Sequence, residues 1–368
     1  MTSAPYAQLA LTPPGRLATS GSAGKHDLRT RLAAHGVPVP RSWTADEPER
    51  IRPALVRSGY PAVVKPDGLG GGRGVYLVTS AQQVPGWLAM LGQYQYRGPV
   101  LAEEYVGGPQ LTVLTSSDSG RHRVTAVIAT ELSLPPLFVE MGHVYSTAVP
   151  AETATAGAQG GPAANGSPAF ASPDVHRPAS GAGRQARARE AAGAVALAAL
   201  DACGHATGPA QVSVRIADSG PVVMGLHRGA SADPVVRLPR HAAAAAGQPG
   251  ITTAAAVSST AATSHFWLPA GDVEAVGALD PIRALPWVAE LAFGFGPGDR
   301  LPQITDARTR HGHVTVTAAH PAEAAERIAT VKTMLAVTVR PRLPLGAVPR
   351  PRSPRRSVTV APHSDRAP

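Results

Sequence analysis

Cysteine, lysine and aromatic residues are scarce in this chain of 368 residues. The chain contains one cysteine, Cys203, and aromatic residues make up 4% of the sequence. A single cysteine cannot form a disulfide within the chain, which is typical of proteins in a reducing compartment. The first residues also lack the basic start and sustained apolar run of a signal peptide. We therefore expect a cytoplasmic protein.

Long apolar runs are absent as well. The most apolar stretch, residues 191–203, is rich in alanine and shorter than the roughly 20 residues that a transmembrane helix needs, so we expect no membrane partner. The formal net charge is +9, but residues 340–368 contain seven arginines and one acid. The rest of the chain is therefore close to neutral, and we expect no nucleic-acid partner. A basic tail can hold an acidic partner weakly or simply be solvated, and composition favours the solvated tail.

The lysine usage carries information because the three lysines, Lys25, Lys65 and Lys332, are a small minority of the 34 basic residues. In a background so biased towards arginine, a retained lysine indicates a need for a compact ammonium rather than a planar guanidinium.

Three segments have low complexity or no apolar periodicity, and we expect them to be disordered. They are an N-terminal tail, an internal insertion and a tail rich in proline and arginine, at residues 1–24, 152–183 and 341–368. Such segments cannot bury enough apolar surface to offset the entropy of ordering. We expect them to pack against nothing.

The remaining sequence alternates helical and strand patterns and predicts an α+β fold. We expect helices at 25–36, 53–58, 81–92, 184–203 and 321–335. We expect strands at 61–65, 75–78 and 100–106, and hairpins within 111–132 and 211–226. Residues 242–263 are again rich in alanine, threonine and serine, like the insertion, and we assign them no element.

A loop rich in glycine joins the first two strands. Its glycines, Gly68, Gly70, Gly71, Gly72 and Gly74, let backbone N–H groups approach a ligand closely, and Lys65 precedes the loop on its strand. The strings that define the Walker loop and the dinucleotide fingerprint are absent, and a strand rather than a helix follows the loop. The pattern indicates a flap over phosphate groups. A hairpin without a ligand is the alternative.

The order of these segments resembles that of the ATP-grasp family. The strings KHDLRTRLAAHGVPVP, GYPAVVKPDGLGGGRGVYLV, VLAEEYVGG and FVEMGHVYSTAVP carry the resemblance, which is closest to the carboxylate–amine ligases of the amino-acid-ligase and biotin-carboxylase-like branch. It implies a two-lobed core with a first lobe at 25–99 and a second lobe at 100–240. A small α+β subdomain at 265–340 follows.

The resemblance also implies roles for individual residues. Lys25 and Lys65 match the lysines that bind the phosphates of ATP, and Gly70, Gly71, Gly72 and Gly74 match the flap. Glu103, Glu104 and Val106 match the hinge segment that recognises adenine, where a backbone N–H and C=O pair suits the base edge. His143 matches a substrate-binding histidine, and Arg228 matches a catalytic arginine.

The metal site departs from the family pattern. Ser213, Met224 and Leu226 stand where the family has two glutamates and an asparagine, and Gln110 stands where many relatives have an acid. Magnesium prefers oxygen ligands, usually carboxylates. We therefore expect Mg²⁺ only as an ion carried by the nucleotide. Substitution by Asp201, Asp218 or Asp233 is the alternative, and Asp233 is the best placed of the three.

Three hypotheses follow. The first is an ATP-binding ATP-grasp protein whose catalysis is impaired or lost. The second is an active ligase that joins amino acids or another small carboxylate to an amine. Ligases of this type usually carry a domain of roughly a hundred residues before the first lysine, and here a protein partner would supply it, since 24 residues precede Lys25. The third is a scaffold subunit that binds no nucleotide.

Overall fold

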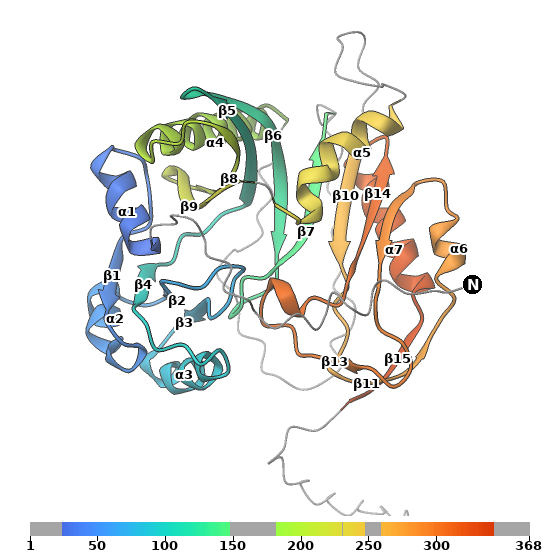
Figure 1. Ribbon diagram of the computed structural model, residues 1–368, viewed down its shortest axis with the longest axis horizontal. Helices are drawn as coiled ribbons and strands as arrows, with labels where there is room; N and C mark the ends of the chain where they lie inside the picture. Colours follow the sequence, from blue (N-terminus) through green and yellow to red (C-terminus); the bar gives the residue numbers. More distant parts are fainter. Residues whose placement is uncertain (1–23, 148–181, 230, 247–258, 342–368) are drawn as a thin grey trace, which may run out of the picture.

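The computed structural model describes residues 24–147, 182–229, 231–246 and 259–341. These residues form a four-stranded, an eight-stranded and a three-stranded sheet with helices packed around them, which confirms the α+β fold class (Figure 1). The three segments expected to be disordered lie outside the described residues, apart from Gly24, residues 182 and 183 at the start of a helix, and Pro341 at the end of a strand.

The N-terminal lobe is built on the four-stranded sheet, whose strand order is β1-β4-β2-β3. Its strands are β1 Ser42–Ala45, β2 Ala62–Pro66, β3 Tyr76–Val78 and β4 Val100–Glu104. Its helices are α1 Lys25–Ala34, η1 Pro48–Arg50, α2 Arg52–Ser58, η2 Ala81–Gln83 and α3 Val84–Gly92. The bounds of α1, α2, α3, β2, β3 and β4 agree with the expected helices and strands to within a few residues, whereas β1 and η1 were not expected.

Burial of an apolar run explains this lobe. All five residues of β2 are buried, and the strand lies between β4 and β3. Helices α2 and α3 close the core beneath the sheet, where Trp87 is fully buried. A buried indole needs a hydrogen-bond acceptor, and the Trp87 N–H donates to the carbonyl of Gly74 at 2.9 Å. The core therefore fixes one end of the glycine loop.

The second lobe and much of the C-terminal region share the eight-stranded sheet, in the order β12-β14-β10-β7-β6-β5-β8-β9. Its strands are β5 Gln110–Asp118, β6 Arg121–Leu132, β7 Glu140–Ser146, β8 Gly208–Ala217, β9 Gly220–Arg228, β10 Thr260–His265, β12 Val288–Ala292 and β14 His313–Ala318. Every pairing in this sheet is antiparallel. The expected hairpins within 111–132 and 211–226 are β5–β6 and β8–β9.

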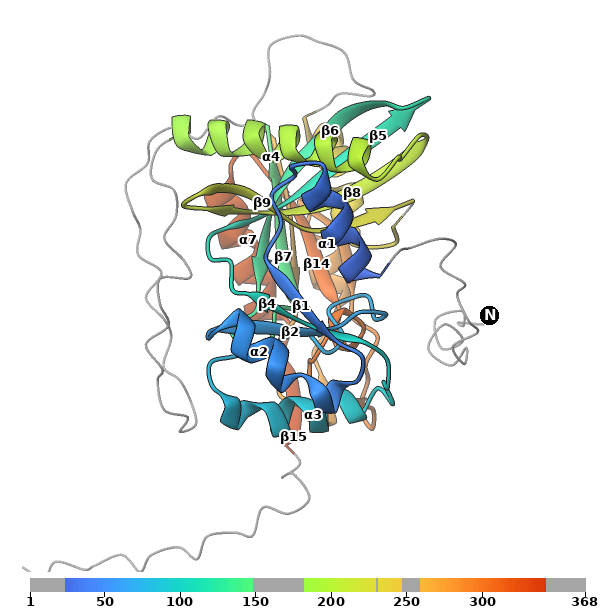
Figure 2. The same ribbon diagram turned by 90° about the vertical axis from the view of Figure 1, so that its left-hand side faces the viewer.

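Helices cover the large sheet on both faces (Figures 1 and 2). Helix α4 Ala182–Ala202 packs with α1 against β5, β8 and β9, and its core includes Leu111, Val113 and Val212. Helix α5 Leu238–Ala245, which follows η3 Pro234–Arg237, packs against Leu114 and Ile128 instead. Helix α7 Pro321–Met334 covers β10 and β14.

The alanine- and threonine-rich stretch at 242–263 is not featureless. Residues 242–245 complete α5, and residues 260–263 belong to β10, an interior strand that is buried throughout. Alanine and threonine fit here because β10 is covered on both faces and small side chains let α5 and α7 approach it. The C-terminal region therefore continues the large sheet as well as forming the small sheet β13-β11-β15. Its other elements are β11 Gly271–Val276, α6 Asp280–Arg283, β13 Arg300–Leu301, η4 Ala307–Thr309 and β15 Val337–Pro341.

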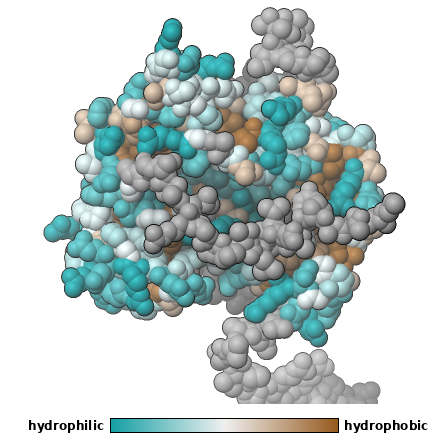
Figure 3. All heavy atoms as spheres, in the orientation of Figure 1, coloured by the Kyte–Doolittle hydropathy of each residue, from teal (hydrophilic) through white to brown (hydrophobic). Residues whose placement is uncertain are grey.

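The C-terminal region touches the N-terminal lobe at the glycine loop. The Ala307 N–H donates to the carbonyl of Gly71 at 3.0 Å. The Tyr94 hydroxyl donates to the buried carboxylate of Asp306 at 3.0 Å. On the face shown in Figure 3, hydrophilic residues cover most of the described surface and apolar ones lie in separate small areas. Among the described helices, none has the length and apolarity that a membrane span requires.

Candidate functional site

The glycine loop forms a hairpin, as the sequence predicts. Strands β2 and β3 pair antiparallel, with Val64 opposite Tyr76, and residues 67–75 connect them. Gly74 has a φ of +70°, and a Cβ there would lie 2.7 Å from the Cγ of Pro66, so the position requires glycine. Gly71 and Gly72 also have positive φ; a Cβ at Gly71 would touch that of Ala307 at 3.9 Å, whereas Gly72 has open space around it. The base of the loop is therefore tightly packed, and Gly72 has room on its open side.

Lys65, on β2 of this hairpin, faces Glu103 of β4. The Lys65 Nζ atom is 2.5 Å from Glu103 Oε2, and the Arg29 Nε atom is 3.0 Å from Glu103 Oε1. All three side chains are buried, with exposed fractions of 3% for Arg29, 6% for Lys65 and 1% for Glu103. This group of three residues, which we call the Glu103 triad, joins α1, β2 and β4 around one carboxylate.

Charge and burial set the titration of the triad. Burial would raise the pKa of Glu103, but the Lys65 and Arg29 charges outweigh it and lower that pKa. Burial lowers the pKa of Lys65; the Glu103 charge opposes this effect, whereas the Arg29 and Arg215 charges add to it. Glu103 is therefore ionised and already paired, and its role as an adenine acceptor remains a prediction.

Lys25 contacts the loop itself. Its ammonium donates to the carbonyls of Pro66, Asp67 and Leu69 at 2.8, 3.0 and 2.5 Å. Burial, with a contribution from the Lys65 charge, lowers the pKa of Lys25 to about 8. The three carbonyls use the donors that a phosphate would take. Phosphate binding by Lys25 therefore requires these contacts to be exchanged.

Some of the polar groups in the hinge segment, at the end of β4 and after it, already have partners within the protein. Glu104 pairs with Arg41 at 2.8 Å, on the side of β4 away from Glu103, so its carboxylate is not directed at Lys65. The Arg215 guanidinium donates to the carbonyl of Val106 at 2.9 Å. A cavity of about 1630 Å³ borders this segment; its lining includes Glu104, Val106 and Arg215 but neither Lys65 nor the loop glycines.

The β8–β9 hairpin differs from the expected metal site in geometry as well as in chemistry. Ser213 pairs with Gly225, but Val214 pairs with Val223, so Met224 is an extra residue in a bulge. Beyond the bulge, Leu226 packs into the core that α1 and α4 share. Arg228 follows on the same side as Leu226, close enough to Cys203 that its charge opposes the effect of burial, which raises the pKa of that thiol. Leu226 and Arg228 therefore lie on the opposite face from Ser213.

The three aspartates considered as substitute ligands are all placed elsewhere. Asp201 is 3.2 Å from the His122 ring at the end of α4. Asp218 lies beside the β8–β9 turn and lines the cavity. Asp233 caps η3, where its side chain accepts from the N–H of Val235 and pairs with Arg310 at 2.9 Å.

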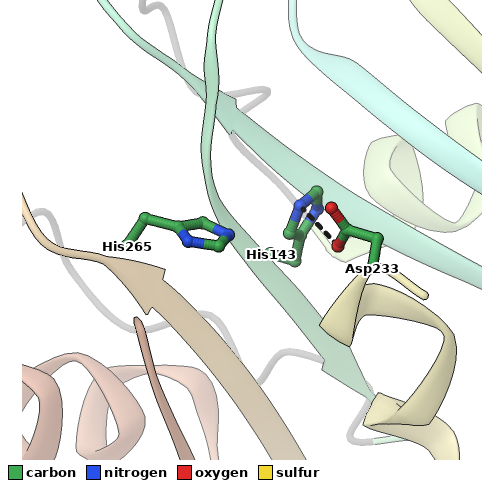
Figure 4. Close-up of side chains that lie close together, drawn as sticks. All are labelled: His143, Asp233 and His265. Carbon is green, nitrogen blue, oxygen red and sulfur yellow. Dashed lines mark ion pairs between the residues drawn. The ribbon is translucent and has the colours of Figure 1, made fainter. Parts of the chain in front are cut away.

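Asp233 belongs to a second polar group, in which His143 of β7 and His265 of β10 face it (Figure 4). The ligand atoms of these three residues lie within 4.8 Å of one another, a spacing that could suit a metal ion. Arg310 already provides the positive charge there, because its NH2 group pairs with Asp233 and its NH1 group contacts the His265 Nε2 atom, both at 2.9 Å. A metal ion would have to displace this guanidinium.

Polar and charged side chains that could bind a substrate surround His143. Its Nε2 atom is buried without a hydrogen-bond partner, 4.0 Å from Glu140 and 3.9 Å from Asp233. Gln110, where many relatives have an acid, donates to Glu140 at 3.1 Å. The substrate role of His143 stays a prediction, now with a buried atom that lacks a partner.

Acid is expected to destabilise the fold through His143 and His265. Burial lowers the pKa of His143 to about 4 and that of His265, with help from Arg310, to about 3. In the unfolded chain both histidines have a pKa of about 6.5, so well above that pH both rings are neutral in the folded and in the unfolded chain. As the pH falls below 6.5, the unfolded chain binds protons on these rings and the folded chain does not. The free energy of unfolding that is present at neutral pH is therefore lost as the pH falls towards 4. Each shift corresponds to about 3 kcal/mol or more.

Urea unfolding between pH 4 and 8 measures this effect. His143→Asn should flatten the slope between pH 6.5 and 4, whereas exposed His35→Asn should leave it unchanged. An unaltered slope in His143→Asn contradicts the assignment.

Sequence reasoning missed the three arginines that organise these groups. Arg29, Arg215 and Arg310 each contact residues distant in the sequence, such as Glu103, Val106 and Asp233. Nothing in the local sequence distinguishes Arg215 and Arg310 from the other arginines of this arginine-rich chain. Arg29 differs, since it lies one helical turn after Lys25 and so shares its side of α1.

Comparison with known protein families agrees with the fold. Residues 30–122 match the ATP-grasp domain, and residues 264–340 match the L-amino acid ligase C-terminal domain 2. The chain thus carries an ATP-grasp domain followed by a C-terminal domain of the L-amino acid ligase type, which confirms the resemblance drawn from the sequence.

Individual relatives are distant. The L-amino acid ligase from Bacillus licheniformis is 15% identical with a TM-score of 0.63, over 86% of this chain and 73% of that chain. The N5-carboxyaminoimidazole synthase from Aspergillus clavatus, solved with ADP and 5-aminoimidazole ribonucleotide, is 14% identical with a TM-score of 0.54, over 84% and 72% of the two chains. These likenesses establish the fold.

Curated relatives match over shorter stretches. The D-alanine–D-alanine ligase of Beijerinckia indica is 34% identical over 101 residues, which is 27% of this chain and 32% of that ligase. The phosphoribosylamine–glycine ligase of Leifsonia xyli matches over 24% of its own length. The chain thus spans a third or less of these relatives.

Proposed function

We propose that this chain binds ATP between the β2–β3 hairpin and the hinge segment, and that it derives from ATP-dependent carboxylate–amine ligases with catalysis impaired or lost. One observation carries the proposal. Lys65, on β2 of the glycine hairpin, is paired with Glu103, yet the β8–β9 hairpin has Ser213 and Met224 where the family pattern has glutamates.

Binding would use groups that the fold already positions. The Lys65 ammonium has three donors, and its ion pair with Glu103 leaves donors for phosphate oxygens. Backbone N–H groups of the glycine loop would close over the same oxygens. Gly72 has open space around it, whereas movement of Gly71 would exchange its hydrogen bond with Ala307. The backbone of Tyr105 and Val106 would meet the adenine edge. The Val106 carbonyl accepts from Arg215 and has a second lone pair for the adenine amino group.

Impaired catalysis follows from what these enzymes need. Formation of an acyl phosphate from ATP requires a divalent ion that neutralises charge on the transferred group. A serine hydroxyl, a thioether and an alkyl chain are poor partners for a hard cation. Mg²⁺ would be held mainly by the nucleotide itself, and turnover would fall by orders of magnitude.

An active ligase is the second candidate, and the polar group around His143 favours it. Glu140, Asp233 and Arg310 together offer partners for both the amino and the carboxylate groups of an amino acid. Such an enzyme would join a small carboxylate to an amine, with a partner protein completing the substrate site. The Nε2 atom of buried His143 has no hydrogen-bond partner. It could bind a substrate only if the substrate, or a water molecule between them, reaches this atom.

Two measurements on the full chain separate these candidates. ATP at a hundred times its dissociation constant should stabilise the protein by about 2.7 kcal/mol, and the absence of stabilisation would support a scaffold subunit.

ADP release is then measured with a panel of amino-acid pairs and Mg²⁺. The wild-type chain should show little release, and Ser213→Glu/Met224→Glu should show more. Robust turnover by the wild-type chain alone contradicts impaired catalysis.

A further inference from the structure

Positive charge collects where β2, β4 and β8 meet α1. Four basic residues lie close together there: Lys25, Lys65, Arg29 and Arg215. The charge of Lys65 lowers the pKa of Lys25, and the charges of Arg29 and Arg215 lower the pKa of Lys65. Two carboxylates, Glu103 and Asp67, oppose these four cations. A formal excess of two positive charges therefore remains in a largely buried region, which we call the basic cluster.

Two donors of the basic cluster have no acceptor. The Arg29 NH1 and Arg215 Nε atoms are buried without a hydrogen-bond partner, on side chains that are 3% and 5% exposed. Burying a charged N–H group without an acceptor is costly. The same two guanidinium groups are otherwise well anchored, Arg29 to Glu103 and the Met224 carbonyl, and Arg215 to the Val106 carbonyl. They are thus held in place with donors to spare.

These groups occupy the neighbourhood in which the family pattern expects metal ligands. Arg215 is two residues after Ser213 on β8 and shares its face, beside Gln110 and Thr112 of β5. Arg29 donates to the backbone carbonyl of Met224 at 2.7 Å. The residues present therefore do not fit a divalent cation. Ser213 offers a neutral hydroxyl, and the two positively charged guanidinium groups would repel the ion.

We infer that the basic cluster binds the phosphate groups of ATP without a divalent cation, and that Arg29 and Arg215 supply the positive charge that a metal supplies in carboxylate-lined sites. A guanidinium suits this task because it keeps its charge when buried, and each of the two has a donor atom without an acceptor. The inference rests on the proposed function, since it names the ionic form in which ATP binds to the same site.

Calorimetric titration of ATP into the full chain, with EDTA or with excess Mg²⁺, tests the inference. Affinity in EDTA should equal or exceed that with Mg²⁺, because Mg²⁺ cancels charge that the arginines recognise. Arg215→Gln should weaken metal-free binding by about tenfold. Arg123→Gln, an exposed arginine on β6, is the matched control and should bind like the wild-type chain.

A second variant keeps the test decisive if Arg215→Gln folds poorly. Ser213→Glu places a carboxylate beside Arg215 and should make ATP binding depend on Mg²⁺. ATP binding by the wild-type chain only with Mg²⁺ overturns the inference and leaves the proposed function standing. Failure of ATP to bind under either condition overturns the proposed function instead.

Discussion

Glu103→Gln is expected to lower the free energy of unfolding by about 3–5 kcal/mol, which is the usual cost of breaking a buried ion pair. The carboxylate is 1% exposed and pairs with Lys65 and Arg29, which are themselves buried. A neutral amide leaves both cations uncompensated. Lys25 and Arg215 add to the repulsion, because both act on Lys65 or its neighbours.

The neighbouring glutamate provides a matched control. Glu104 pairs with Arg41, whose side chain is 74% exposed, so Glu104→Gln should cost no more than about 1 kcal/mol. Urea denaturation of the two variants at neutral pH measures the difference. Equal losses for the two adjacent positions would show that the Glu103 triad is not a buried centre of charge.

The local parts of the site could be predicted from the sequence. The apolar run before the glycines predicts a strand that includes Val63, Val64 and Lys65. The second strand after the glycines predicts a hairpin, which the antiparallel β2–β3 pair confirms. Strands β2 and β4 place Lys65 and Glu103 on one face. Their ion pair was not predicted, because the resemblance implies separate roles for them at the phosphates and at adenine.

The bulge in β9 could not be predicted. Alternation along a regular strand places Met224, Leu226 and Arg228 on one face, and the single extra residue moves Leu226 and Arg228 to the other. The glycine in VVMGLHR is compatible with a bulge, but where the extra residue falls depends on how β9 pairs with β8. Leu226 and Arg228 therefore do not share the face of Ser213.

Strand β10 shows the limit of composition. Residues 260–263 resemble the low-complexity segments by their alanine and threonine content, yet they form a buried interior strand. The Thr263 and Thr315 hydroxyl oxygens lie 2.7 Å apart across the β10–β14 pair, which satisfies their polar groups. Partners far along the chain decide whether such a segment folds.

Weaker ATP binding is expected for Lys65→Met. Removal of a charged hydrogen-bond donor costs about 1.5–3 kcal/mol, equivalent to a ten- to hundredfold weaker affinity. Methionine preserves the length and apolar stem of the side chain. Glu103 keeps Arg29 as a partner in this variant, so the fold should survive better than in Glu103→Gln.

Lys332→Met is the matched control, because Lys332 is exposed on α7 and shares neither the hairpin nor the Glu103 triad. Its thermal unfolding and ATP affinity should equal those of the wild-type chain. A comparable loss of affinity in Lys332→Met would mean that the effect reflects overall charge rather than the site.

The most direct test of the account is calorimetric titration of ATP into the wild-type chain, Lys65→Met and Lys332→Met under identical conditions. The account predicts saturable binding at one site in the wild-type chain and in Lys332→Met, and at least about tenfold weaker binding in Lys65→Met. Equal ATP affinity in Lys65→Met and the wild-type chain would contradict a nucleotide site beneath the β2–β3 hairpin.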